Sequence, residues 1–181
     1  IKEVNPDAII LALSTAAMGG LNIDYEFSKR VFDAGAYDYM DVLSIHPYDW
    51  SGQFRDTLFI ESAEKLHKLM REYGEEKPVW ITEFGFSSYI GTGSYTKREQ
   101  YQNHALGRAI SKAYNLYDKY IMYCLADKGD RKEQEHNWGL INAVERPEIS
   151  PYSAKESYVA MAAFSHFIDA DSETKETLNW E

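Results

Sequence analysis

The sequence predicts an α/β protein in which parallel strands are joined by helices. Four short apolar runs, typical of strands buried on both faces, are each followed by a longer segment with helical periodicity. The runs begin near residues 8, 42, 79 and 120, so the repeat is 34, 37 and 41 residues long. An open doubly wound sheet and a (β/α)8 barrel both have this order of elements. A whole barrel takes about 250 residues, so this chain would hold half of one.

The four predicted strands span residues 8–13, 41–46, 79–83 and 120–125. The third, Val79-Trp80-Ile81-Thr82-Glu83, is built from residue types that favour pleated and packed surroundings, apart from its last residue. Pro78 can open this strand, and Pro47 closes the one before it. An acidic residue, Glu83, therefore stands where a hydrophobic strand ends. Such a carboxylate is either a partner in a structural ion pair or part of a site.

The predicted helices span about 25–34, 56–73, 97–117 and 154–167. The first ends before Gly35, a residue type that commonly follows the last helical turn. Two pairs with capping-box spacing, Thr96 with Glu99 and Ser153 with Glu156, predict the starts of the last two helices.

Composition excludes several classes of function. The net charge of −10 argues against nucleic acid and anionic membrane surfaces as partners, and no apolar run approaches the roughly 20 residues of a membrane span. The 14 Tyr, 8 Phe and 4 Trp fit a sugar or ligand cleft as well as an ordinary core. The single cysteine, Cys124, lies in an apolar run, so we expect a buried inert thiol and no disulfide.

No cofactor or metal site is predicted. The five histidines lack the spacing of paired metal ligands. The loop 127–135 carries four acidic residues, but three basic residues are interspersed among them, which favours a solvated loop over a cation site. Met18-Gly19-Gly20, after the first strand, lacks the pattern of a phosphate-binding loop.

Polar and aromatic residues follow three successive strands. His46-Pro47-Tyr48 closes the second strand, with Trp50 just beyond; Glu83 ends the third; Tyr123 lies near the end of the fourth, and Trp138 follows the next loop. Each of them alone has a plain structural explanation, such as a packed histidine or a core aromatic residue. In a parallel barrel, however, these strand ends share one rim, where barrel enzymes keep their active sites.

These segments resemble a known family. His46-Pro47-Tyr48 after Asp-Val-Leu-Ser-Ile, the segment Lys77-Pro-Val-Trp-Ile-Thr-Glu-Phe-Gly85, and Trp138-Gly139-Leu140-Ile141 are similar to the C-terminal half of clan A glycoside hydrolases. The closest group is the family 39-like and cellulase-like enzymes, which are secreted or cell-associated. The resemblance covers nearly the whole chain. It implies that residues 1–181 are half of a catalytic (β/α)8 barrel, supplying strands five to eight.

The resemblance also implies roles for individual residues. Glu83 matches the nucleophile of a retaining mechanism that cleaves β-linked oligo- or polysaccharides. His46 and Tyr48 match positions that line the subsite of the reacting sugar, and Trp50, Tyr123 and Trp138 are further candidates for sugar contact. A retaining glycosidase also needs a second carboxyl group, about 5–5.5 Å from the first, to protonate the leaving oxygen.

The chain departs from the family pattern in two respects. The family places its acid/base Glu after an Asn at the end of strand four, and this sequence contains no Asn-Glu pair. The family's usual Trp on strand eight is replaced by Met122 or Tyr123, and Trp138 is the alternative platform. We therefore expect a fragment that is inactive alone, because its acid/base residue lies upstream. Its two open sheet edges would pair with the missing N-terminal half or with a second copy.

Two other functions remain open on the residues. One is a non-catalytic glycan-binding or scaffold protein that keeps the cleft but has lost the acid/base residue. An Asn-Glu pair upstream of the chain would favour the enzyme over this alternative. The other is an open-sheet ligand-binding domain, which the absence of a glycine-rich phosphate loop disfavours.

Overall fold

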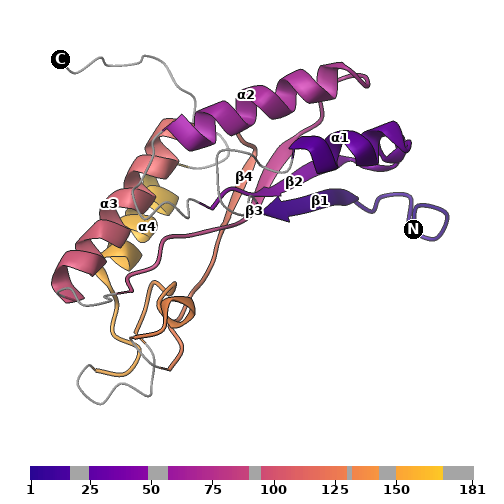
Figure 1. The fold of residues 1–181 in the computed structure, drawn as a ribbon. Helices are drawn as coiled ribbons and strands as arrows, with labels where there is room; N and C mark the ends of the chain where they lie inside the picture. The colour runs from indigo at the N-terminus through magenta and orange to yellow at the C-terminus, as the bar shows by residue number, and fades with distance from the viewer. Residues whose placement is uncertain (17–24, 49–56, 90–94, 130–131, 143–149, 169–181) are drawn as a thin grey trace. The chain divides into compact units, whose positions relative to one another are not determined.

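The computed structural model is an α/β fold, as the sequence predicts (Figure 1). It describes residues 1–16, 25–48, 57–89, 95–129, 132–142 and 150–168. The strands are β1 (Leu11–Ala16), β2 (Val42–His46), β3 (Val79–Phe84) and β4 (Lys119–Met122). The helices are α1 (Tyr25–Asp33), α2 (Thr57–Arg71), α3 (Tyr95–Ala113) and α4 (Glu156–Phe167), with short 3-10 helices η1 (Ala36–Tyr39) and η2 (Gln134–His136).

The four strands form one parallel sheet in the order β1-β2-β3-β4, so neighbours in the sheet are also neighbours in the chain. A doubly wound sheet reverses its strand order at a switch point. A (β/α)8 barrel keeps the sequential order seen here. Among the described residues, β1 and β4 each pair on one side only.

The chain divides into two compact units. The first comprises residues 1–86 and 109–123 and contains the whole sheet; the second comprises residues 87–108 and 124–181 and contains α4. Within the described residues, no helix combines the length and the apolar character that crossing a membrane requires.

In the first unit, α2 packs against one face of the sheet. Leu43 and Ile45 of β2, like Val79 and Ile81 of β3, are completely buried. Phe59 of α2 meets Phe84 of β3 edge to face, with their ring centroids 6.2 Å apart. Because apolar burial stabilises by about 25 cal/mol per Å², this face holds the sheet together. The opposite face is free to carry polar residues.

Several predicted boundaries are wrong in the first unit. β1 begins at Leu11 rather than residue 8. Pairing starts with Ile10, whose carbonyl oxygen accepts N–H bonds from Asp41 and Val42 and whose N–H donates to Asp41 Oδ2. Lys2, which donates to the same side chain, and the Ile10 N–H together hold the pKa of Asp41 below its usual value. β4 ends at Met122 rather than at residue 125, because Cys124 and Leu125 pair instead with the segment 138–141.

The helix starts in the second unit also differ from the prediction. α3 begins at Tyr95, so Thr96 lies inside it and cannot be its N-cap. It ends at Ala113 rather than 117. Lys155 is the N-cap of α4, and its backbone N–H donates to Leu140 O. Ser153 is therefore not the cap of α4, and its hydroxyl accepts a hydrogen bond from Asn142 instead.

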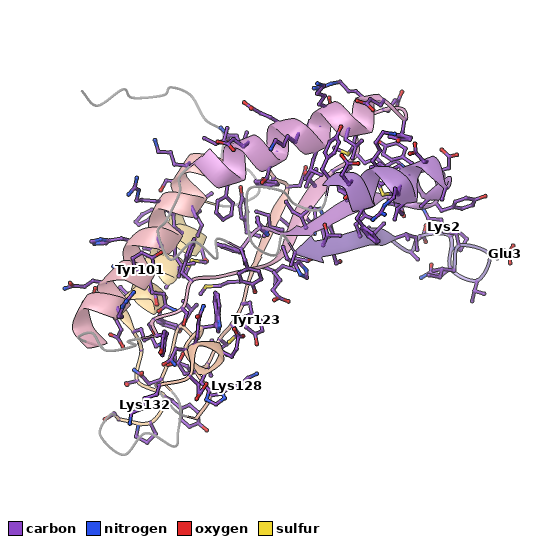
Figure 2. The ribbon with its side chains drawn as sticks, in the orientation of Figure 1. Lys2, Glu3, Tyr101, Tyr123, Lys128 and Lys132 are labelled. Carbon is purple, nitrogen blue, oxygen red and sulfur yellow. The ribbon has the colours of Figure 1, made fainter. Side chains whose placement is uncertain are left out.

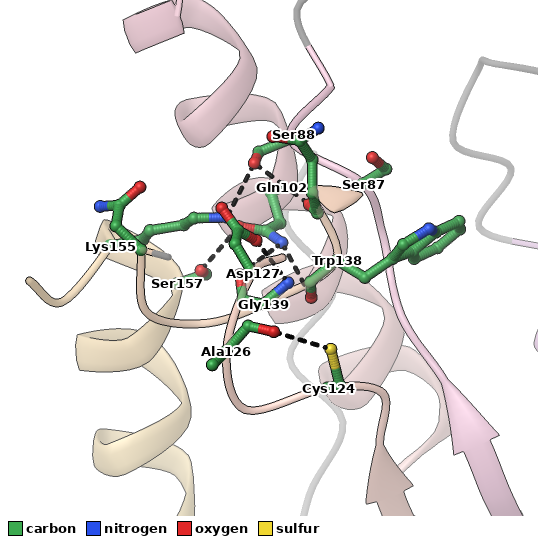
Figure 3. Close-up of polar contacts among 12 residues, drawn as sticks. Ser87, Ser88, Gln102, Cys124, Ala126, Asp127, Trp138, Gly139, Lys155 and Ser157 are labelled. Atoms are coloured by element: carbon green, nitrogen blue, oxygen red, sulfur yellow. Dashed lines mark hydrogen bonds and ion pairs between the residues drawn. The ribbon is translucent and has the colours of Figure 1, made fainter. Parts of the chain in front are cut away.

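A buried ion pair organises the second unit (Figure 3). Lys155 Nζ lies 2.7 Å from Asp127 Oδ1 and 2.8 Å from Ser88 Oγ, and both charged side chains are fully buried. Asp127 Oδ1 also accepts the N–H of Gly139 at 2.8 Å. The prediction of a solvated loop at 127–135 is therefore wrong for Asp127, although Lys128, Glu133 and the rest of 132–135 are exposed.

Gln102 of α3 extends this network. Its side-chain amide donates to the carbonyl oxygens of Trp138 and Gly139, and its own oxygen accepts a hydrogen bond from Ser157 of α4 at 2.9 Å. Cys124 donates its thiol to Ala126 O, and burial raises its pKa. The direction of this shift agrees with the inert thiol expected from the sequence, although Cys124 is half-buried rather than buried.

Gly139→Ala is expected to destabilise the protein by about 1–3 kcal/mol, the usual cost of overpacking. A Cβ at this position would lie 2.1 Å from Asp127 N and 2.3 Å from the carbonyl carbon of Ala126. Both are backbone atoms that cannot rotate away. Urea unfolding measures the change in the free energy of unfolding.

Gly107→Ala is the matched control for this substitution. Its Cβ would meet only the Phe164 ring, at an ordinary 3.6 Å, in the interior of α3. Alanine there should be neutral or stabilising by up to about 1 kcal/mol, because glycine weakens helix interiors. Equal effects of the two substitutions would show that the close approach at Gly139 does not matter.

Candidate active site

Glu83 lies on β3, one residue before its end, and its side chain is about one-third exposed. The hydroxyl of Tyr48, two residues beyond β2, donates to Glu83 Oε1 at 2.6 Å. Tyr48 itself is only 7% exposed, so the hydrogen bond is formed from a fixed side chain. The result is a solvent-accessible carboxylate that is held by a charge-assisted hydrogen bond.

His46, the last residue of β2, faces the other oxygen of the same carboxylate. Its Nδ1 lies 4.0 Å from Glu83 Oε2, and its Nε2 lies 3.0 Å from Thr82 Oγ1. Tyr48 and His46 therefore lie beside different oxygens of the Glu83 carboxylate. Three of the residues that the sequence selected come together because they end or follow adjacent parallel strands.

A β-bulge in β3 explains why Glu83 points to this face. Ile81 pairs with Tyr120 and Phe84 with Met122, so β3 advances three residues while β4 advances two. Strict alternation would place Ile81 and Glu83 on the same face. The extra residue instead returns Phe84 to the α2 side, where Ile81 is also buried, and leaves Thr82 and Glu83 both facing His46. Bulges beside active sites commonly re-aim side chains in this way.

The other predicted site residues have different positions. Tyr123, labelled in Figure 2, directly follows β4 and is half-buried. Its backbone N–H donates to Phe84 O at 2.7 Å. Trp138 belongs to the second compact unit, where it is buried. Trp50 lies outside the described residues. Sugar contact by these three aromatic residues stays a prediction.

Sequence reasoning missed three hydroxyl residues of this face: Ser14, Ser44 and Thr82. They lie on β1, β2 and β3 and form hydrogen bonds with one another and with His46. One signal was present in the sequence, since Ser44 and His46 are two residues apart and so share a face of β2. Within the described residues, no group of three or more potential metal ligands occurs.

Comparison with solved structures supports the fold. A GH2 β-galacturonidase from Eisenbergiella tayi is similar with a TM-score of 0.56 and 16% identity, over 80% of this chain and 26% of that one. Native xylanase 10B from Thermotoga maritima is similar with a TM-score of 0.55 and 19% identity, over 90% of this chain and 48% of that one. The chain thus spans about a quarter and about half of these enzymes. Together with the strand order, these similarities confirm the predicted fold class, of which this chain supplies four βα units.

Comparison by sequence identifies the family. No curated protein gave a sequence match. The model of the glycosyl hydrolase catalytic core family matches residues 9–152, which include all four strands and the cluster of His46, Tyr48 and Glu83. The predicted resemblance to glycoside hydrolases is confirmed for the catalytic core family as a whole. The narrower likeness to family 39 stays a prediction. The chain belongs to the glycosyl hydrolase catalytic core family.

Proposed function

We propose that this chain carries the nucleophile of a retaining glycoside hydrolase that cleaves β-linked oligo- or polysaccharides, and that Glu83 is that nucleophile. The observation that carries the proposal is a solvent-accessible carboxylate that accepts a hydrogen bond from Tyr48 on one oxygen and has His46 Nδ1 4.0 Å from the other. A carboxylate held in one orientation is prepared to attack an anomeric carbon. Family membership supports the reaction class.

The mechanism has two displacements. In the first, a Glu83 oxygen bonds to the anomeric carbon while the bond to the leaving oxygen breaks and that oxygen takes a proton from the second carboxyl group. In the second, water attacks the anomeric carbon, gives its proton to the same carboxylate and releases Glu83. We propose that the second carboxyl group lies outside these 181 residues, because the sequence lacks the Asn-Glu pair of the family pattern.

A mechanism-based label tests the assignment. A 2-fluoro glycoside with an activated aryl leaving group needs little help from a general acid, so it should trap Glu83 as a stable glycosyl ester. The full-length polypeptide is incubated with glucosyl, galactosyl, xylosyl and glucuronyl reagents in turn. The modified peptide is then located by mass spectrometry. We expect the label on Glu83, and a label on any other carboxylate would refute its role as nucleophile.

The identity of the reactive reagent would also define the sugar. Pre-incubation with an unlabelled β-linked oligosaccharide of the same sugar should slow the labelling, because both occupy one subsite. Glu64→Gln, an exposed position on α2, serves as the control protein and should be labelled at the normal rate.

A further inference from the structure

Three hydroxyl groups form a row across the sheet that ends at His46. Ser14 Oγ donates to Ser44 Oγ at 2.9 Å, Ser44 Oγ lies 2.5 Å from Thr82 Oγ1, and Thr82 Oγ1 lies 3.0 Å from His46 Nε2. The row crosses β1, β2 and β3 in order and lies within the first compact unit. Ser44, at its centre, is completely buried. Ser44 must therefore find its hydrogen-bond partners within the row, because water does not reach it, whereas Ser14 is exposed and Thr82 is half-buried.

The start of the row is built from unusual backbone. Leu13 and Ser14 have φ values of 81° and 47°, in the left-handed region that residues other than glycine rarely adopt. The register of β1 against β2 shifts between Leu13 and Thr15, so Ser14 is the extra residue of a bulge. Such conformations are destabilising by themselves and persist where the surroundings impose them. Here the bulge turns the Ser14 hydroxyl toward Ser44.

Counting protons gives the row a direction. Each hydroxyl has one proton to donate. Ser14 donates a hydrogen bond to Ser44. Ser44 can therefore donate its own hydrogen bond to Thr82, and Thr82 can then donate one to His46 Nε2. An Nε2 that accepts a hydrogen bond leaves the proton of the neutral ring on Nδ1. That nitrogen faces Glu83 Oε2.

We propose that Ser14, Ser44 and Thr82 are positioning residues that hold His46 in the Nδ1–H tautomer, so that the ring presents a neutral donor to Glu83 Oε2. Tyr48 already donates to Oε1. Glu83 would then accept a hydrogen bond from Tyr48 on one oxygen and have the His46 Nδ1–H 4.0 Å from the other, close enough to orient the carboxylate by electrostatic attraction. The catalytic consequence rests on the proposed role of Glu83, whereas the tautomer does not.

The tautomer is measured directly by NMR on the full-length protein labelled with ¹⁵N-histidine. Two-bond correlations within the imidazole ring distinguish a protonated nitrogen from an unprotonated one, and His46→Gln assigns the signals by their loss. We expect a protonated Nδ1 and an unprotonated Nε2 in His46. A protonated Nε2 in the unmodified protein would overturn the proposal.

Substitutions then test whether the hydroxyl row sets this state. Thr82→Val removes the hydroxyl with little change in shape and should move the His46 signals toward the Nε2–H form, whereas Thr82→Ser should restore them. Thr15→Val is the matched control, since among the described residues the buried Thr15 hydroxyl has no hydrogen-bond partner. Ser44→Ala provides a second break in the row if Thr82→Val fails to fold. Unchanged His46 signals in the folded variant would refute the positioning role.

Kinetics separate this proposal from the proposed function. In the complete enzyme, Thr82→Val should lower kcat/KM by about tenfold to hundredfold, the size of effect expected from misplacing a catalytic group. Most of the loss should fall on kcat, and Thr82→Ser should recover it. If the His46 signals shift in Thr82→Val but the 2-fluoro glycoside does not label Glu83, the nucleophile assignment is wrong and the positioning role of the hydroxyl row stands. If Glu83 is labelled but the His46 signals do not shift, the positioning role is wrong and the nucleophile assignment stands.

Discussion

Glu83→Gln is expected to lower kcat/KM of the complete enzyme by about 10⁴–10⁶-fold, the range seen when a covalent nucleophile is removed. The amide is a poor nucleophile, so the glycosyl-enzyme intermediate cannot form. Gln keeps the shape of the side chain and an oxygen that can accept the Tyr48 hydrogen bond. The free energy of unfolding should therefore change little. Initial rates on an aryl glycoside of the reactive sugar, together with urea unfolding, measure both quantities.

Chemical rescue makes this prediction specific to a nucleophile. In Glu83→Ala, azide can enter the space left by the side chain, attack the anomeric carbon of an activated aryl glycoside and displace the aryl oxide. The product should be a glycosyl azide of inverted configuration, because only one displacement occurs. Glu64→Gln, at an exposed position on α2, should retain full activity without azide. Near-normal turnover by Glu83→Gln, or rescue that does not invert, would contradict the assignment.

The existence and order of the elements could be predicted, but their ends could not. The two inner strands, β2 and β3, match their predicted ranges to within one residue because they are apolar and buried against α2. The outer strands, β1 and β4, are shifted or shortened by up to three residues. Their limits depend on pairing with residues far away in the chain, such as Asp41 with Ile10. Residue types along a single strand do not encode that pairing.

The grouping of three candidate site residues was predictable because it follows from topology. His46, Tyr48 and Glu83 end or follow adjacent parallel strands, and parallel strands bring such residues to one edge. The bulges at Ser14 and Glu83 were not predictable. A bulge is a mismatch in the number of residues between two strands, and neither strand reveals it alone. Thr82 was assigned only to the buried strand, although ordinary alternation opposite Ile81 places it beside His46.

The ion pair of Lys155 with Asp127 could not be predicted from the sequence either. The spacing of residues in the sequence gave no sign that Lys155 pairs with Asp127, 28 positions away. Asp127 was instead predicted to be part of a solvated loop, because basic residues surround it in the sequence. Both partners are fully buried, so the loss of either would leave an uncompensated charge inside the second unit.

Lys155→Met is expected to lower the free energy of unfolding by about 3–5 kcal/mol, because it leaves the Asp127 carboxylate buried without its cation. Methionine approximates the length of the lysine stem, so little packing is lost. Lys65→Met, at an exposed position on α2, is the control and should change the free energy of unfolding by less than about 0.5 kcal/mol. Urea unfolding monitored by far-UV circular dichroism gives both values.

A double variant separates the stranded charge from any loss of packing. Asp127→Asn combined with Lys155→Met removes both charges, and the asparagine Oδ1 can still accept the Gly139 N–H bond that Asp127 accepts. The double variant should be more stable than Lys155→Met alone, because no uncompensated charge remains buried. Asp127→Asn alone completes the comparison. If the losses in the free energy of unfolding of Asp127→Asn and Lys155→Met simply add in the double variant, the two charges are not coupled and Lys155 stabilises the fold through its stem. If they do not add, the attraction between Lys155 and Asp127 is what fixes the Trp138–Gly139 segment against α3 and α4 within the second unit.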